Sequence, residues 1–231
     1  MTFTECSPQV KNLAKTPELI DSLEAITFGL ENCERVMTEL GRSYADYVGN
    51  ENRFSCHLES RTNEILAQKG YSPQDLYAEN FFQKDTTEYA GLYCGCNDTD
   101  IIAHFREMIG HDLQYPDLII HRPNNMLHQN CFVEVKFEGN PGIWSDFEKL
   151  TNFKNACQYL LPHVDAGRVN PVFAFHVFIF LGRNLKDKII HSDVATKTNL
   201  RERYQDIVCI YKEDANFRCI TLGEILNEIN N

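Results

Sequence analysis

Residues 115–137, YPDLIIHRPNNMLHQNCFVEVKF, predict a β-hairpin near the middle of the chain. Two short apolar runs flank a segment rich in Pro and Asn, a composition typical of strand, turn and strand. Because side chains alternate along a strand, Glu134 and Lys136 share one face of the second strand, and the first strand can bring Asp117 beside them. Two carboxylates and an amine are costly to bury together, and a divalent cation would make them compatible.

The composition is that of a globular protein. The chain has 231 residues, of which 43% are hydrophobic and 24% charged, enough for one substantial domain with its own core. No apolar run approaches the ~18 residues that a membrane-spanning helix needs, and the N-terminus lacks the apolar core of a signal peptide. We therefore expect a cytoplasmic protein with no membrane partner. The nine cysteines are scattered and odd in number, which indicates free thiols.

The net charge of −11 argues against a protein that binds nucleic acid through a broad basic surface. It leaves room for an acidic site with a small basic rim.

Helical and strand patterns alternate along the chain. A helix begins at Thr16-Pro17 and continues to about residue 47, with a break expected near Gly29. Ser145 is predicted to begin a later helix, with Glu148 completing a capping box. The other predicted helices are 51–69, 98–109 and 221–229, and the strands are 76–84, the two arms of the hairpin, 172–181, 207–211 and 217–220.

From residue 51 the predicted order is helix, strand, an inserted helix, two strands, helix and strand. Together with Pro116-Asp117 and Glu134-Val135-Lys136, this αβββαβ order resembles the PD-(D/E)XK, or restriction-endonuclease-like, nuclease superfamily. Asn50-Glu51 resembles its acidic first-helix position, and YPDLIIHRP, CFVEVKF and DFEKL (146–150) resemble blocks of a bacterial group. The similarity covers about residues 50–182.

The resemblance implies an α/β fold. It would consist of a restriction-endonuclease-like αβββαβ core with a mixed central sheet flanked by helices, in a domain over 50–231. Residues 1–49 would form an N-terminal helical extension, which leaves a homodimer through these helices open.

The resemblance also implies a nuclease that depends on Mg²⁺ (or Mn²⁺) and acts on nucleic acid, with DNA as the expected substrate. Asp117 and Glu134 would hold the metal, with the Val135 carbonyl and Glu51 as further ligands. Lys136 would orient or deprotonate the attacking water and offset negative charge. Glu51 is equally explained as a first-turn acid favoured by the helix dipole.

Five further residues are predicted to lie near the site or the nucleic-acid backbone: Glu79, Arg122, Lys149, Lys154 and Gln158. Glu79 is equally suited to an ion pair with Arg or Lys. The residues on the helix after the motif are also typical of a solvated face.

Three readings of the motif remain. The intact Asp117, Glu134 and Lys136 favour a metal-dependent phosphodiesterase. The acidic charge slightly favours a catalytically silent binding or assembly protein on the same fold. A plain hairpin with a solvent-facing ion pair between Glu134 and Lys136 would explain the pattern structurally.

Overall fold

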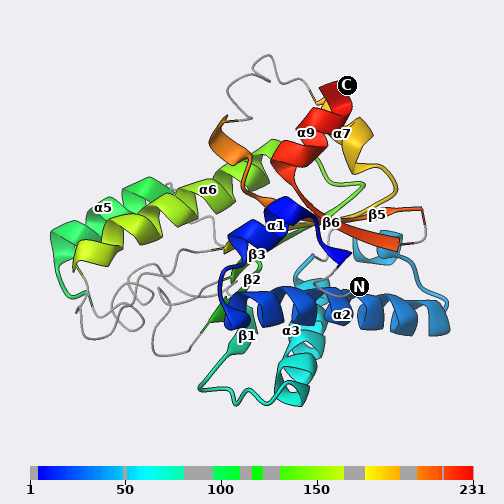
Figure 1. Cartoon of the computed structure of the whole chain (residues 1–231), viewed down its shortest axis with the longest axis horizontal. Helices are drawn as coiled ribbons and strands as arrows, with labels where there is room; N and C mark the ends of the chain where they lie inside the picture. Colours follow the sequence, from blue (N-terminus) through cyan, green and yellow to red (C-terminus); the bar gives the residue numbers. More distant parts are fainter. Residues whose placement is uncertain are drawn as a thin grey trace.

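A computed structural model of the chain describes residues 5–48, 51–80, 96–109, 116–121, 131–163, 175–192, 202–214 and 216–230. In these residues a six-stranded sheet lies between two layers of helices (Figure 1). Its strands are β1 (Tyr77–Asn80), β2 (Leu118–His121), β3 (Cys131–Phe137), β4 (Phe175–Leu181), β5 (Val208–Glu213) and β6 (Asn216–Thr221). The predicted α/β class is confirmed.

The sheet is mixed, and its strands are neighbours in the order of the chain. The pairs β1–β2, β2–β3 and β5–β6 are antiparallel, while β3–β4 and β4–β5 are parallel. The predicted strand over 172–181 is central, and its residues Val177–Leu181 are buried, as expected for a strand covered on both faces.

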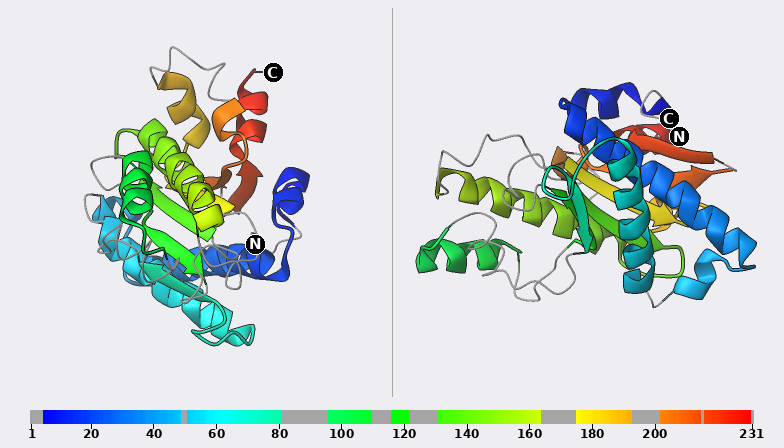
Figure 2. Two further views of the ribbon diagram at one scale, coloured as in Figure 1. Left: turned by 90° about the vertical axis from the view of Figure 1, so that its left-hand side faces the viewer. Right: turned by 90° about the horizontal axis from the view of Figure 1, so that it is seen from below.

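Helices cover both faces of the sheet (Figure 2), and each face has its own hydrophobic core. One face packs against α5 (Thr99–Ile109), α6 (Ile143–Leu160), α7 (Leu185–His191) and α9 (Leu222–Asn230). The other packs against α1 (Pro8–Leu13), α2 (Pro17–Glu39) and α3 (Glu51–Gln68). Alternation along β3 sends Phe132 into the first core and Val133 and Val135 into the second. Short 3₁₀ helices, η2 (Tyr44–Tyr47) and η4 (Leu161–His163), follow α2 and α6.

Helix α2 differs from its sequence prediction. Its start is as predicted, because the Thr16 hydroxyl accepts from the Leu19 N–H at 3.3 Å and Pro17 is the first helical residue. The predicted break at Gly29 is wrong, since the helix runs through it to Glu39. A Cβ on Gly29 would stand 3.0 Å from Oγ1 of Thr62. The glycine therefore serves close packing of α2 on α3.

The start predicted for α6 is also wrong. The helix begins at Ile143, and its N-cap is Gly142 with φ of 82°, a conformation that favours glycine. Ser145 lies inside the first turn, where its hydroxyl donates to the Gly142 carbonyl at 2.5 Å. The capping box with Glu148 is absent, because the turn before the helix is closed by glycine.

The N-terminal segment packs against the C-terminal part of the chain. The Ser7 N–H donates to the Cys219 carbonyl at 3.1 Å, and the Ser7 hydroxyl donates to Glu224 at 2.6 Å. All eight cysteines in the described part of the chain are free thiols, and Cys56 is the exposed one. No helix among the described residues has both the length and the hydropathy to cross a bilayer.

A buried histidine on β4 should make the protein sensitive to acid. His176 stacks on Phe132 with ring centroids 5.8 Å apart, and burial, aided by Lys154, lowers its pKa to about 3. The unfolded chain takes up this proton near pH 6.5. Stability is therefore lost as the pH falls from about 6.5 towards 3. We expect His176→Gln to show a smaller drop in urea midpoint between pH 7 and pH 4.5 than the wild type.

The control is His104→Gln, which changes a half-exposed histidine on α5. Parallel pH curves for the wild type and His176→Gln would contradict the neutral buried imidazole.

Candidate active site

The antiparallel register of β2 and β3 brings the motif carboxylates together. Leu118 pairs with Val133 and Ile119 with Phe132, so one position further Asp117 lies opposite Glu134. Side chains at opposed positions point to the same face, and here that face is the one covered by α6. Lys136 follows two residues later on the same face. The three positions therefore share one face of the sheet, as the alternation along the strands predicted.

Helix α6 adds two charged side chains to this group. Lys149 donates to Oε1 of Glu134, and the exposed fractions of the two side chains are 15% and 6%. Nζ of Lys136 lies 2.9 Å from Oδ2 of Asp146, with exposed fractions of 12% and 9%. Two nearly buried ion pairs thus link β3 to α6.

Asp117 is held by the backbone of β3. Its Oδ2 accepts a hydrogen bond from the Val135 N–H at 2.7 Å. The N–H and C=O of one strand residue point to the same side. The Val135 carbonyl therefore faces the side on which Asp117 lies, which is the position predicted for a metal ligand.

The pKa of Glu134 is raised well above its ordinary value. Burial is the main cause, and the negative charges of Asp117 and Asp146 add to it, while Lys149 opposes it. Burial lowers the pKa of Lys149, but Glu134 and Asp117 outweigh this effect and raise it. Three carboxylates face two lysines, so the cluster has one negative charge in excess when all its groups are ionised.

The donor set suits a hard cation. Oε2 of Glu134 is buried and accepts no hydrogen bond from the described residues. A cation held by this oxygen, Asp117 and the Val135 carbonyl would relieve the repulsion that raises the Glu134 pKa. Across the described ranges, however, no three side chains of Asp, Glu, His or Cys form a metal-binding group. The fit therefore rests on two carboxylates and a backbone oxygen.

The other predicted residues are only partly at this site. Lys149 joins the cluster, as described above. Glu79 lies 3.0 Å from Nε2 of the buried His121. The backbone of Glu51 begins α3, but its side chain and Arg122 lie outside the described residues.

Lys154 and Gln158 lie further along α6. At 1.5 Å per residue they are about 7.5 Å and about 13.5 Å beyond Lys149 along the helix axis. Lys154 is close enough to His176 to lower its pKa, and Gln158 is half-buried. Neither of them contributes to the two ion pairs.

Two residues near the cluster were not predicted. Asp146 lies three positions before Lys149, so both face β3 from one side of α6, and this spacing was the available signal. Lys188 on α7 donates to the Asn140 carbonyl at 2.8 Å. Burial is the main cause that lowers the pKa of Lys188, and the positive charge of Lys136 lowers it further. A second amine thus lies near Lys136 at the end of β3.

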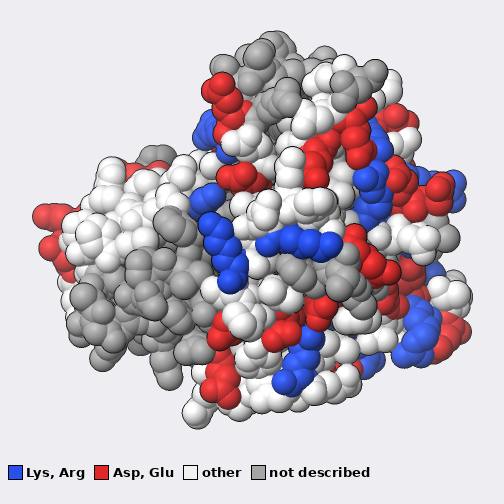
Figure 3. Space-filling model, in the orientation of Figure 1, with Lys and Arg blue, Asp and Glu red and all other residues white. Residues whose placement is uncertain are grey.

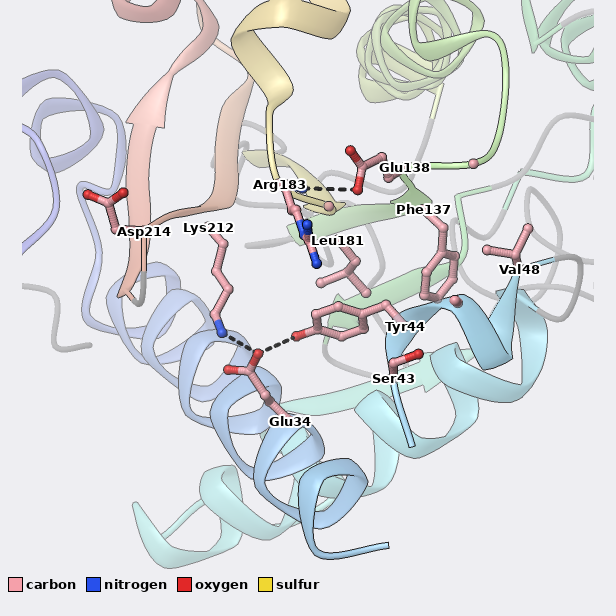
Figure 4. A pocket seen from close by; sticks show the side chains of 13 residues that line it. Glu34, Ser43, Tyr44, Val48, Phe137, Glu138, Leu181, Arg183, Lys212 and Asp214 are labelled. Atoms are coloured by element: carbon pink, nitrogen blue, oxygen red, sulfur yellow. Dashed lines mark hydrogen bonds and ion pairs between the residues drawn. The ribbon is translucent and has the colours of Figure 1, made fainter. Parts of the chain in front are cut away.

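A pocket of about 860 Å³ lies at the carboxyl ends of β3, β4 and β5, a common ligand position in α/β sheets (Figure 4). The Tyr44 hydroxyl donates to Oε1 of Glu34 at 3.3 Å, and Lys212 donates to the same oxygen. Three acidic and two basic side chains line the pocket, namely Glu34, Glu138, Asp214, Arg183 and Lys212. Their opposite charges give the pocket no preference for anions.

The visible surface has mixed charge. Acidic and basic side chains are interspersed in Figure 3, and the described residues form no broad basic area on that face. This agrees with the net charge of −11.

Comparison of the chain with known protein families, curated proteins and solved structures finds no match.

Proposed function

We propose that this protein is a Mg²⁺-dependent phosphodiester hydrolase acting on nucleic acid, with DNA as the expected substrate. The observation that carries the proposal is the register placing Asp117 opposite Glu134, with Lys136 next along the same face. A buried carboxylate oxygen without a hydrogen-bond donor among the described residues supports it. Such an oxygen is costly unless a cation or proton occupies it.

The order of elements supports a restriction-endonuclease-like core. From α3 the chain continues through β1, β2, β3, α6 and β4, with α5 inserted between β1 and β2. This is the αβββαβ order, with Asp117 directly before β2 and Glu134 and Lys136 on the neighbouring strand β3.

In the proposed mechanism Asp117 and Glu134 would hold the metal through carboxylate oxygens, with the Val135 carbonyl as a further ligand. When bound, Mg²⁺ supplies an activated water and stabilises charge on the phosphate oxygens. Lys136, paired with Asp146 at 2.9 Å, acts as a cation that orients the water and offsets charge on the substrate. Asp146 is a positioning residue, because it acts through Lys136.

Lys149 has a separate role in this scheme. It neutralises Glu134 and so occupies one oxygen of a carboxylate that the metal also needs.

The second candidate is a catalytically silent binding or assembly protein on the same fold. The specific observation in its favour is that Lys149 and Lys136 already pair with Glu134 and Asp146. Two closed ion pairs between β3 and α6 can hold the helix on the sheet without any metal.

A cleavage assay separates the two candidates. Incubation with linear DNA, circular DNA and RNA is expected to give cleavage with Mg²⁺ or Mn²⁺, none in EDTA, and recovery when metal is added in excess. Intact substrates under every metal condition would favour the silent scaffold. Cleavage that continues in EDTA would exclude the metal-dependent mechanism.

A further inference from the structure

A small hollow lies between the end of α2 and the first half of α3. Its volume is about 110 Å³. The basic side chains that line it are Arg42, Arg53, Arg61 and His57, and we call it the arginine notch. Its other lining residues are apolar or aromatic, namely Cys33, Val36, Met37, Leu40, Tyr47 and Phe54.

The charge of the arginine notch is unusual for this chain. None of its lining residues is acidic, although the chain has 33 acidic and 22 basic residues. Arg61 is engaged with Glu64 at 2.8 Å. Arg42 and Arg53 are exposed and form no ion pair with another described residue. Within the described part of the chain, no acidic side chain therefore competes for these two guanidinium groups.

The backbone fixes the positions of the basic residues in the notch. Gly41 has φ of 64°, and the Arg42 N–H donates to the Met37 carbonyl at 2.8 Å, a motif that closes the end of α2. On α3, Arg53, His57 and Arg61 follow one another every four residues and so share one side. The His57 ring contacts Tyr47 edge-on, with centroids 6.4 Å apart.

We propose that the arginine notch binds a phosphate group in the backbone of the nucleic acid. This inference rests on the proposed function. A guanidinium presents planar, paired N–H donors that match a phosphate, and two of them around a small hollow can hold one group. Because the chain is strongly acidic overall, binding needs such local basic sites.

The position of the notch fits this role. Tyr47 contacts Phe54 and Phe54 contacts Phe137, with ring centroids 5.7 Å and 5.5 Å apart. Phe137 directly follows Lys136, although the two side chains point to opposite faces of the sheet. A chain of aromatic contacts thus connects the wall of the notch to the residue that follows Lys136 on β3.

The test measures binding in EDTA, so that metal-dependent cleavage does not interfere. Fluorescence anisotropy of a labelled oligonucleotide is compared for the wild type, Arg42→Gln/Arg53→Gln and a control, Lys15→Gln/Arg35→Gln. The control removes two exposed positive charges outside the notch. We expect the notch variant to bind about tenfold more weakly, with the slope of log affinity against log salt reduced by roughly 1 to 2. The control should bind like the wild type.

Equal binding by the notch variant and the wild type would overturn the inference. A second result would also overturn it: the notch variant no longer binds inorganic phosphate in calorimetry but binds the oligonucleotide as the wild type does. Free phosphate would then be the ligand. The proposed function fails separately: notch-dependent binding without cleavage under any metal would retain this inference and reject the nuclease.

Discussion

Replacing Asp117 with Asn, or Lys136 with Met, is expected to reduce metal-dependent cleavage at least about hundredfold. Asp117→Asn removes one of the two carboxylates proposed to hold the cation, and Lys136→Met removes the amine nearest to them along β3. Initial rates on linear DNA at saturating Mg²⁺ measure the effect. Asp117→Asn should also need more Mg²⁺ for half-maximal rate, whereas Lys136→Met should not.

The matched control is Glu148→Gln. Glu148 lies on α6 between Asp146 and Lys149, but its side chain is 51% exposed and pairs with Arg203. Its rate should match that of the wild type. If the Asp117 and Lys136 variants also cleave at the wild-type rate, the cleaving site lies elsewhere.

Replacing Lys149 with Met is expected to destabilise the protein by about 3–5 kcal/mol at neutral pH. The substitution leaves the Glu134 carboxylate buried without its cation, close to Asp117 and Asp146. Because the pKa of Glu134 is raised in the folded state, the folded protein binds its proton more tightly, and stability falls as the pH rises. The loss should therefore be larger at pH 8 than at pH 5. Urea unfolding at both pH values measures it.

Two controls belong to this experiment. Glu134→Gln/Lys149→Met should recover much of the lost stability, since the charge and its partner are removed together. Lys186→Met breaks more exposed ion pairs and should cost about 1 kcal/mol or less.

Added Mg²⁺ gives a further readout. It should raise the melting temperature of Lys149→Met more than that of the wild type, because the cation replaces the missing positive charge. A pH-independent loss with no response to Mg²⁺ would mean that Lys149 contributes packing alone.

The local pattern predicted much of the site and of the fold. Alternation along β3 was enough to put Glu134 and Lys136 on one face, and the two apolar runs were enough to predict the antiparallel pair β2–β3. The predicted turn at 123–125 lies outside the described residues. Helix ends were less predictable. Ser145 satisfies the sequence pattern of an N-cap as well as a true N-cap does. The start of α6 is set by the backbone conformation of Gly142, which has no distinct sequence signal.

Contacts between distant elements could not be predicted. Nothing in the sequence shows that Lys149 turns towards Glu134 and not towards solvent, because that depends on how α6 lies across the sheet. The arginine notch is a similar case. Arg42 and Arg53 line the same hollow because α2 packs closely on α3, and the missing side chain of Gly29 permits this approach to Thr62.

The sheet also separates Lys149 and its ion-pair cluster from the arginine notch, because the two lie on opposite faces. The described cores on its two faces have no member in common, with Lys149 on one side and the arginine notch on the other. Substitutions at the two places should therefore have additive effects on folding. If the effects of the two substitutions stop being additive only when nucleic acid is bound, one nucleic-acid molecule would be in contact with both places. The ligand itself, and not the protein, would be the connection.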